Sequence, residues 1–446
     1  MKYPVPENIR QFASIFRENG HRLYIVGGAV RDHLLGRPNS DYDFCTDAKP
    51  EEVIPMFRRV IPTGIKHGTV TVLFKGESFE VTTFRTEGAY SDQRHPDSVT
   101  FVTDLSEDLS RRDFTVNAFA ADCLDGSIID LFDGMKDLRS KTIRAIGVPC
   151  ERFEEDALRL MRLARFCSKL GFEPDPETKQ AAAQLSASIT NVSQERIYDE
   201  LSKILMTEKP TVGLRLLEDI GVLGYILPEL TECRKVEQTK VSATDVLEHI
   251  YNTVDASAHF RYSYNVRLAA LLHDIAKPQT MIINPYGIMR FYGHDIKSAQ
   301  MARVVMRRLK CSNQLTDTVC NLIENHMVKY SPNWTDGAVK RFIKRVGKEN
   351  INELFELQWC DQIASEGKSK VEEYDPFIRR IKELENQPMS VRELAVSGDD
   401  LAQAGIPKSK VMGEILDELL EMVIDYPSLN EKETLINQAI LLYKNK

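Results

Sequence analysis

Residues 24–46 read YIVGGAVRDHLLGRPNSDYDFCT, and this stretch decides the fold. Its pattern predicts a strand, a glycine turn, a short helix and a second strand that holds Asp41 and Asp43. Because side chains alternate between the two faces of a strand, both carboxylates point the same way. Carboxylate oxygens suit Mg²⁺, and paired metal ions can activate a 3′-hydroxyl while they neutralise a leaving pyrophosphate. The second strand is therefore predicted to carry a catalytic metal site.

The glycines and the helix of the same stretch predict a phosphate site. Gly27 and Gly28 let backbone N–H groups approach a triphosphate, and the N-terminus of the following helix favours the anion. Arg31 adds a charge-assisted contact. A glycine pair or an Asp-x-Asp pair alone is common in turns, but the ordered combination is far more specific.

The composition of the 446 residues limits the class of protein. Hydrophobic residues make up 42% and charged residues 28%, which is typical of globular chains, and no apolar run approaches the roughly 18 residues of a membrane span. No secretory signal is visible at the start, and no two of the eight cysteines are closer than nine residues, which excludes CxxC zinc or redox sites. We expect a cytoplasmic, multidomain protein with no membrane partner.

Charge predicts where nucleic acid could bind. The net charge of −8 repels phosphate globally, so such a site must be a local basic patch. Residues 139–169 carry eight Lys or Arg against four acids. A solvated helix face is the alternative interpretation of this patch.

The two parts of the chain differ in periodicity. In the first 145 residues, β-prone stretches recur between Gly, Pro, Asp and Asn, at 23–26, 69–74, 79–84, 99–102 and 127–131. From about residue 150 the spacing of apolar residues becomes helical. The sequence thus predicts an α+β chain, with a small mixed α/β head and a long helical remainder.

Five ordered motifs carry a resemblance to a known family. The stretch 24–46 is followed by RRDFTVNAFA (111–120), DLFDGMKDLRSKTIRAIG (130–147), FEEDALRLMRLARFCSKLGF (153–172) and SQERIYDELSKIL (193–205). Together they resemble the nucleotidyltransferases related to DNA polymerase β, in the branch of class II tRNA nucleotidyltransferases (CCA-adding enzymes) and bacterial poly(A) polymerases. The resemblance implies a polymerase β-type head.

The resemblance also assigns roles to residues of these motifs. Asp156 and Arg159, three positions apart on a predicted helix, would present hydrogen-bonding edges to the incoming base, so that the protein replaces a template. A surface ion pair worth under about 1 kcal/mol is the alternative. The other nucleotide-binding candidates, for triphosphate, ribose or primer phosphate, are Arg112, Asp113, Asn117, Arg162 and Arg165. For Asp113 alone, capping of a helix is the alternative.

Two further features follow from the resemblance. Sites of the polymerase β type commonly take a third carboxylate from a neighbouring strand, and Glu80 is the candidate, with an exposed strand glutamate as the alternative. Residues 86–110 resemble the loop that re-aims the templating residues for the third nucleotide. This loop looks full length, although His95 stands where an arginine is frequent, so adenosine addition is expected.

A second polar set lies in the helical half. His249, His273, Asp274 and Asp361 are ordered like the ligands of an HD domain, which residues 245–365 resemble. His294 and His326 are further candidates. Imidazole and carboxylate together suit a divalent transition metal or Mg²⁺, and Lys277 could assist a phosphate substrate. Degenerate, purely structural HD modules are the alternative.

These resemblances imply four domains and a function. The domains are a nucleotidyltransferase head at 1–145, a helical neck and body at 146–245, an HD domain at 246–365 and a helical tail at 366–446 that contacts the tRNA elbow. The implied function is template-independent addition of C, C and A to the 3′ end of tRNA from CTP and ATP, with Mg²⁺ and without a DNA partner. Addition of adenosine only, poly(A) synthesis, and HD-type phosphohydrolysis as a different class of activity are the alternatives.

Overall fold

The computed structural model describes residues 2–39, 41–87, 99–240, 243–286, 289–368 and 371–446. Two compact units divide the chain: Met1–Thr231 with Arg308–Lys310, and Glu232–Arg307 with Cys311–Lys446. Residues 88–98 of the expected loop, His95 among them, lie outside the described residues. The domain boundaries expected at 145, 245 and 365 stay predictions.

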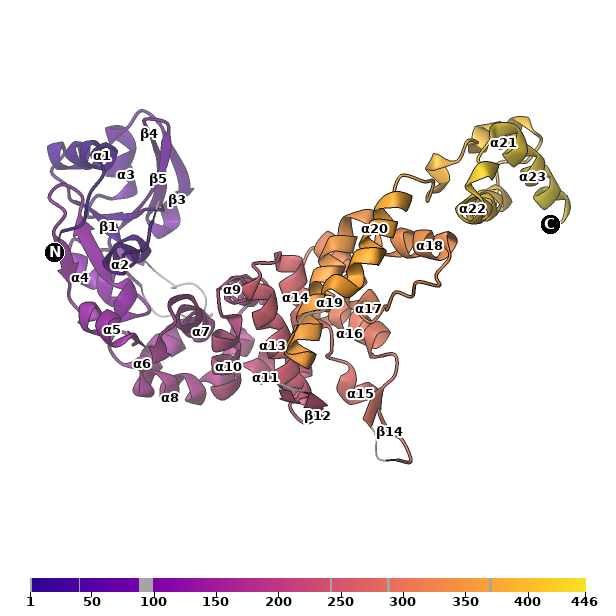
Figure 1. Cartoon of the computed structure of the whole chain (residues 1–446). Coiled ribbons are helices and arrows are strands. Elements are labelled where there is room, and N and C mark those ends of the chain that lie inside the picture. The colour runs from indigo at the N-terminus through magenta and orange to yellow at the C-terminus, as the bar shows by residue number, and fades with distance from the viewer. Residues whose placement is uncertain (1, 40, 88–98, 241–242, 287–288, 369–370) are drawn as a thin grey trace. The chain divides into compact units, whose positions relative to one another are not determined.

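The first unit is built on a seven-stranded mixed sheet (Figure 1) in the order β3-β4-β5-β2-β1-β8-β9. Its strands are β1 (Leu23–Val26), β2 (Asp43–Thr46), β3 (Val60–Gly64), β4 (Thr69–Phe74), β5 (Glu77–Thr83), β8 (Phe119–Asp122) and β9 (Ile128–Asp130). The expected strands at 23–26 and 69–74 are confirmed at those bounds. Residues 99–101 form β7 (Val99–Phe101), which pairs with β6 (Arg85–Glu87) outside this sheet. No sequence pattern had indicated β3 or β8.

The helices of the first unit fall into two groups. Those associated with the sheet are α1 (Glu7–Glu18), α2 (Gly28–Leu34), α3 (Pro50–Met56), α4 (Leu105–Ser110), α5 (Gly134–Ser140) and the 3₁₀ turns η1 (Ile65–His67) and η2 (Thr115–Asn117). The later ones are α6 (Pro149–Glu155), α7 (Leu158–Leu170), α8 (Pro176–Gln184), η3 (Ser186–Asn191), α9 (Gln194–Leu205), α10 (Pro210–Asp219), α11 (Leu223–Ile226) and α12 (Pro228–Cys233), with the short pair β10 (Thr142–Ile143) and β11 (Glu173–Pro174).

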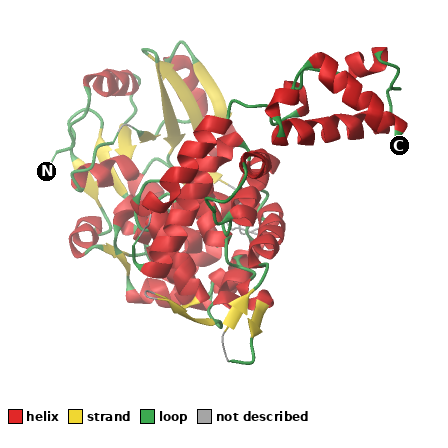
Figure 2. Cartoon of the chain, turned by 45° about the vertical axis from the view of Figure 1, so that its right-hand side comes forward, coloured by secondary structure: helices red, strands yellow, loops and turns green. Residues whose placement is uncertain are grey.

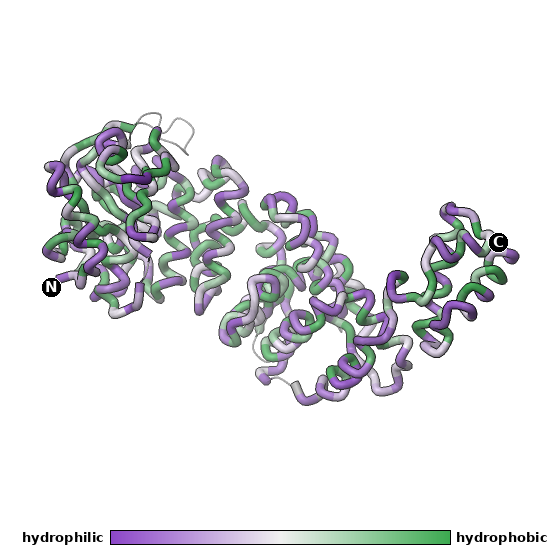
Figure 3. Tube along the Cα trace, turned by 90° about the horizontal axis from the view of Figure 1, so that it is seen from above, coloured by the Kyte–Doolittle hydropathy of each residue, from purple (hydrophilic) through white to green (hydrophobic). Residues whose placement is uncertain are grey.

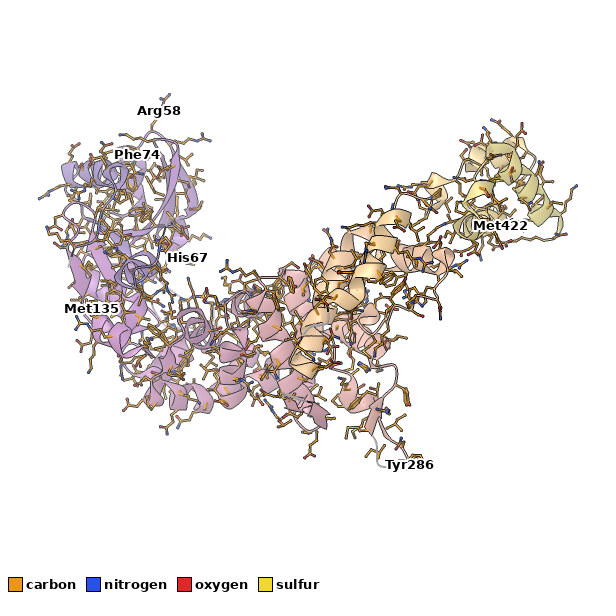
Figure 4. All side chains as sticks on the ribbon, viewed as in Figure 1. Arg58, His67, Phe74, Met135, Tyr286 and Met422 are labelled. Atoms are coloured by element: carbon orange, nitrogen blue, oxygen red, sulfur yellow. The ribbon has the colours of Figure 1, made fainter. Side chains whose placement is uncertain are left out.

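Apolar side chains cover both faces of the sheet because its strands alternate. On one face, Phe12 of α1 packs against Phe44 and Phe74, with ring centroids 5.7 and 5.4 Å apart; Phe74 is marked in Figure 4. On the other face, Leu109 of α4 is buried with Val26. The two layers fix the sheet that carries the site.

The central strand β1 gathers separate parts of the chain at one sheet end. Val26 pairs with Asp43 on one side and with Ala120 on the other, and the Gly27 amide donates to the Phe119 carbonyl at 3.0 Å. The glycine turn, the start of β2 and the segment before β8 therefore meet at this end.

The second unit is almost entirely helical (Figure 2). Its helices are α13 (Val246–His259), α14 (Tyr264–Leu272), α15 (Lys277–Thr280), α16 (His294–Arg308), α17 (Asn313–Asn325), α18 (Asp336–Val346), α19 (Ile351–Glu366), α20 (Asp375–Leu384), α21 (Gly398–Gln403), α22 (Lys410–Asp425) and α23 (Lys432–Lys444). Its strands are β12 (Glu237–Lys240), β13 (Ala243–Asp245), β14 (Met281–Ile283) and β15 (Met289–Phe291). A separate apolar core around Leu401, Leu419 and Leu435 holds the last three helices together.

Polarity along the helices follows their packing. Hydrophobic and hydrophilic segments alternate along the helical trace in Figure 3, as in helices with one buried face. Among the described residues, no helix combines the length and the apolar character that crossing a membrane would need.

Candidate functional site

The glycine turn after β1 forms one wall of a cleft of about 800 Å³ in the first unit. Gly27 has a φ of +67° and a ψ of −122°, a conformation that side chains disfavour. A Cβ at this position would lie 3.1 Å from Nη1 of Arg112. Gly27 and Gly28 therefore leave backbone and arginine exposed to whatever enters the cleft.

Asp41 and Asp43 both line this cleft, but only Asp43 belongs to β2. The expectation that one strand holds both is wrong: β2 begins at Asp43, and Asp41, whose carbonyl accepts a hydrogen bond from the Asn39 side-chain amide at 2.6 Å, lies before the strand. Burial, and then the charge of Asp41, raise the pKa of Asp43, against the opposing effect of Arg112. The two carboxylates repel each other, and both offer only oxygen donors. Such a pair at the end of a sheet fits a divalent cation.

Glu80 lies beside Asp43 on the neighbouring parallel strand. The two residues are register partners in the β2–β5 pair, and register partners project from the same side of a sheet. Glu80 is exposed. Because Glu80 pairs in register with Asp43, it remains the candidate for the third carboxylate.

The cleft is strongly cationic although the whole chain is acidic. Nine cationic side chains and four carboxylates line it; the cations are Arg31, Arg85, Arg111, Arg112, Arg159, Arg162, Arg165, Lys169 and Arg196. Of the basic patch at 139–169, only the members from Arg159 onward take part. Arg144, for example, pairs with Asp137 and Asp175 instead. Such a local excess of positive charge suits a polyphosphate.

A buried network joins the second and fourth motifs. Asp113 accepts hydrogen bonds from Nε of Arg162 at 2.7 Å and from Nδ2 of Asn117 at 3.0 Å. The Asn117 oxygen in turn accepts one from Nη1 of Arg31 at 2.5 Å. Burial disfavours the Asp113 carboxylate, but the charge of Arg162 and the Asn117 amide hold the pKa of Asp113 below its usual value. The network fixes two of the cleft arginines.

The expected base-reading residues do not lie on one helix. Asp156 has extended backbone, with a φ of −143°, and separates α6 from α7. Its carboxylate accepts a hydrogen bond from Nη2 of Arg196 at 2.7 Å, whereas Arg159 pairs with Glu155 and donates to the Arg111 carbonyl at 3.0 Å. The prediction of a helical i,i+3 neighbour pair is therefore wrong, because the helix is interrupted at Asp156. Both side chains still line the cleft.

Several cleft residues escaped the sequence reasoning. Arg111 and Arg196 lie within the quoted motifs, so their positive charge was a usable signal. His67, marked in Figure 4, and Arg85 had no such signal. Contact between Arg85 and the His67 carbonyl links the two.

In the second unit, six imidazole and carboxylate groups converge from separate elements. They are His249 in α13, His273 and Asp274 directly after α14, His294 at the start of α16, His326 directly after α17, and Asp361 in α19. All of them except Asp361 are buried.

Four of these groups have the spacing of ligands around one ion. Nε2 of His249 lies 3.3 Å from Nε2 of His273 and 2.9 Å from Oδ1 of Asp361. Oδ2 of Asp274 lies 3.2 and 3.1 Å from the two histidine nitrogens. Two ligands about 2.1 Å from one ion, at right angles, are about 3 Å apart. The four groups therefore fit a divalent metal.

His294 and His326 face the other oxygen of Asp274. Their Nε2 atoms lie 3.3 and 3.9 Å from Oδ1, and these three buried atoms have no hydrogen-bond partner among the described residues. Nδ1 of His294 lies 2.7 Å from the Phe291 carbonyl, and Nδ1 of His326 lies 2.6 Å from the Ile323 carbonyl. Donation from Nδ1 leaves Nε2 free to ligate. Burial lowers the pKa of His326 to about 4, so this ring is neutral at pH 7.

This cluster opens into a cleft of about 1490 Å³. Lys277, Arg290 and Lys329 are among its lining side chains. Nζ of Lys277 lies 2.5 Å from Oδ2 of Asp274. The cleft thus combines a set of metal-type ligands with cations that suit a phosphate.

The similarity to known proteins spans almost the whole chain. Residues 23–144 match the family described as Poly A polymerase head domain, 171–234 match "Probable RNA and SrmB- binding site of polymerase A", and 293–439 match tRNA nucleotidyltransferase domain 2. A CCA-adding enzyme of Ligilactobacillus salivarius is 34% identical over 447 residues, which cover 99% of this chain and 98% of that protein. The HD resemblance of residues 245–365 stays a prediction.

One solved structure supports the same family, and a second shares the fold. The crystal structure of the Bacillus stearothermophilus CCA-adding enzyme in complex with CTP has a TM-score of 0.75 and 30% identity, covering 99% of this chain and 98% of its own. The Thermotoga maritima CCA-adding enzyme complexed with tRNA_CCA shares the fold, with a TM-score of 0.56 and 21% identity over 97% and 94% of the two chains. With its cationic cleft, its paired carboxylates and this similarity from end to end, the chain belongs to the CCA-adding enzyme family of tRNA nucleotidyltransferases.

Proposed function

We propose that this chain adds C, C and A to the 3′ end of tRNA from CTP and ATP, and that its own side chains, not a nucleic-acid template, select the base. The observation that supports this proposal most strongly is that Asp41 and Asp43 share one cleft with nine cationic side chains. The relatives that match almost the full length are CCA-adding enzymes, and one of their structures holds CTP.

The family implies a divalent metal at the transferase site, and we propose Mg²⁺ held by Asp41 and Asp43, with Glu80 as a third ligand. The all-oxygen donor set and the raised pKa of Asp43 support this assignment. When bound, Mg²⁺ favours the ionised 3′-hydroxyl and offsets charge on the leaving group.

The triphosphate binds to the glycine turn and the nearby arginines. The backbone N–H of Gly28, with Arg31 and Arg112, holds the phosphates, while the Gly27 N–H is taken by the Phe119 carbonyl and Gly27 contributes by its lack of a side chain. The tRNA 3′-oxygen attacks the α-phosphorus, the bond to the β-phosphate oxygen breaks, pyrophosphate leaves, and the hydroxyl proton passes to solvent. The residues contribute by orienting these groups.

The remaining cleft residues recognise the nucleoside and the primer. Asp156 and Arg159 offer acceptor and donor edges to the base. Asn117 and Asp113, which line the same cleft, contact a sugar hydroxyl in this proposal. Arg162 and Arg165 hold nucleotide or primer phosphate.

We also propose that the segment 366–446 contacts the tRNA elbow.

We propose that the protein acts in the cytoplasm. All eight cysteines are free thiols, which supports a reducing compartment.

Extension of three tRNA transcripts tests the proposal. The transcripts end before the CCA, after C, and after CC, and CTP and ATP are supplied singly and together. Completion of all three is expected. Extension of only the CC-ended transcript would show an A-adding enzyme, and long A tails on RNA without a tRNA fold would show a poly(A) polymerase.

A second activity, metal-dependent phosphoester hydrolysis, is favoured by the convergence of six ligand-type groups beside Lys277. A transition metal or Mg²⁺ bound there would supply a Lewis acid and an activated water. Water adds to phosphorus, the ester P–O bond breaks, and the leaving oxygen takes a proton. Release of p-nitrophenol from p-nitrophenyl phosphate, with Mn²⁺, Ni²⁺ or Mg²⁺ added, is expected and should be lost in His273→Ala. No turnover with any of these metals would show that the cluster is structural.

A further inference from the structure

Phe166 of α7 lies between three arginines of the transferase cleft. The guanidinium carbons of Arg31, Arg162 and Arg165 lie 5.5, 5.4 and 4.5 Å from the centre of its ring. Cations within about 6 Å of an aromatic ring centre are attracted by the negative charge of its face. Arg31 belongs to α2, and the other two arginines belong to α7. One ring therefore contacts arginines from two motifs that are far apart in the sequence.

The ring itself is held firmly. Phe166 is 6% exposed and lines the cleft. Its edge packs on Phe114, with ring centroids 5.9 Å apart and planes at 77°, and Phe114 is completely enclosed. Phe166 is therefore buried against a second buried ring beside the cleft.

Each arginine also has a polar partner that fixes one of its edges. Arg31 contacts Asp32 and Asn117, Arg162 contacts Asp113, and Nε of Arg165 lies 3.0 Å from a Glu200 oxygen. A carboxylate orients a guanidinium but cancels its charge. A phenyl ring orients it without cancelling the charge, because the ring carries no net charge.

Arg165 lies in a desolvated position near a second cation, Arg162. Burial, with Glu200 opposing it and Arg162 adding to it, lowers the pKa of Arg165. More carboxylates would relieve the repulsion but would also compete with the phosphates for the arginines. The ring gives attraction while it leaves the remaining N–H groups for an anion.

We propose that Phe166 is a positioning residue for nucleotide phosphates: its ring aligns Arg31, Arg162 and Arg165 while it preserves the positive potential of the cleft. This role rests on the proposed nucleotidyltransferase function. It predicts that an aromatic ring at this position, and not apolar bulk alone, sets the affinity for the triphosphate.

Titration of the full-length protein with CTP, with ATP and with inorganic triphosphate tests the proposal. Phe166→Leu should weaken binding of all three by about tenfold, and Phe166→Tyr should restore it to within about twofold. Phe166→Met, an unbranched apolar side chain of about the same volume as leucine, should behave like Phe166→Leu. Phe172→Leu, at a buried ring of the same motif that does not line the cleft, is the matched control for lost apolar packing and should bind normally.

A double-mutant cycle distinguishes alignment from general packing. Phe166→Leu and Arg165→Gln should be non-additive, since the ring acts through the arginine. Thermal melts check that each variant is folded. Normal triphosphate affinity in Phe166→Leu and Phe166→Met, equal loss in Phe166→Tyr, or strict additivity would each overturn the proposal. If the unmodified protein binds none of the three ligands, the proposed function itself fails, and the role of Phe166 fails with it.

Discussion

Nη2 of Arg196 donates to the Asp156 carboxylate at 2.7 Å, across forty residues of sequence. This bond ties α9 to the break between α6 and α7. One carboxylate oxygen of Asp156 is thereby engaged by Arg196, and the other accepts from the Leu158 amide at 3.0 Å. These two bonds fix the orientation of the Asp156 carboxylate at the wall of the cleft.

Removal of this bond should loosen base selection. Arg196→Ala is expected to raise incorporation of UMP and GMP relative to CMP and AMP by about tenfold, since a hydrogen bond to a charged group contributes about 1.5–3 kcal/mol. Arg196→Lys should restore part of the selectivity. Lys179→Ala, which removes the exposed Lys179–Asp219 pair outside the cleft, is the control. Unchanged selectivity in Arg196→Ala would contradict a role for this pair. Single-turnover incorporation on a tRNA transcript measures the effect.

Loss of a metal-binding carboxylate should stop chemistry but not RNA binding. Asp41→Ala is expected to reduce incorporation by at least about a thousandfold, because several kcal/mol of charge stabilisation disappear. Affinity for tRNA in a gel-shift assay should change less than about twofold. Asp47→Ala, whose side chain pairs with Arg22 outside the cleft, is the control. Continued extension of tRNA by Asp41→Ala would show that the metal assignment is wrong.

A side chain on the glycine turn should affect stability and binding together. Gly27→Ala places a Cβ 3.1 Å from Nη1 of Arg112 at a φ of +67°, so we expect a loss of about 1–3 kcal/mol in the free energy of unfolding and a higher KM for CTP and ATP. Gly36 has a similar φ of +69° with open space around it. Gly36→Ala should therefore lose stability without a change in KM. Equal KM values for the two variants would show that the nucleotide does not approach the Gly27 backbone closely.

The buried Asp113–Arg162 pair should make part of the stability depend on pH. The folded-state pKa of Asp113 lies below the ordinary value of 3.8, so its contribution is fully present well above pH 3.8. It is lost as the pH falls through the folded-state pKa. Asp113→Asn is expected to cost about 3 kcal/mol at pH 7, because Arg162 loses its buried partner. Urea unfolding of both proteins from pH 7 to pH 3 should show that difference shrinking below about pH 4; a constant difference would exclude the ion pair as its source.

Metal binding in the second unit should be visible as stability. Addition of Mn²⁺, Ni²⁺ or Zn²⁺ to chelator-treated protein is expected to raise the melting temperature, since an ion that binds only the folded state stabilises it. His273→Ala should abolish the rise. His259→Ala removes an exposed histidine from the end of α13 and serves as the control. A metal-induced rise that persists in His273→Ala would place the ion elsewhere.

Local pattern was enough to predict several parts of this structure. β1, β4 and α2 lie where the periodicity and the glycines placed them. Residue chemistry also predicted Asp41, Asp43 and Arg31 as neighbours, because the glycine turn and the carboxylates are contained in a short stretch, and all three line one cleft. The order of the five motifs then predicted the family, and the similarity to a CCA-adding enzyme along 99% of the chain confirms this prediction.

Tertiary structure alone decided how these pieces meet. Pairing of β1 with β8 brings Asn117 to Arg31, eighty-six residues away, because strand pairing is a long-range choice. Extended backbone at Asp156 ends a helix that the apolar spacing would have continued, so its ionic partner comes from α9. His249 and Asp361 approach within 2.9 Å only because α13 and α19 pack together. Sequence by itself determined which chemistry this protein has; packing over long distances, which no local pattern encodes, decided which of those groups act together.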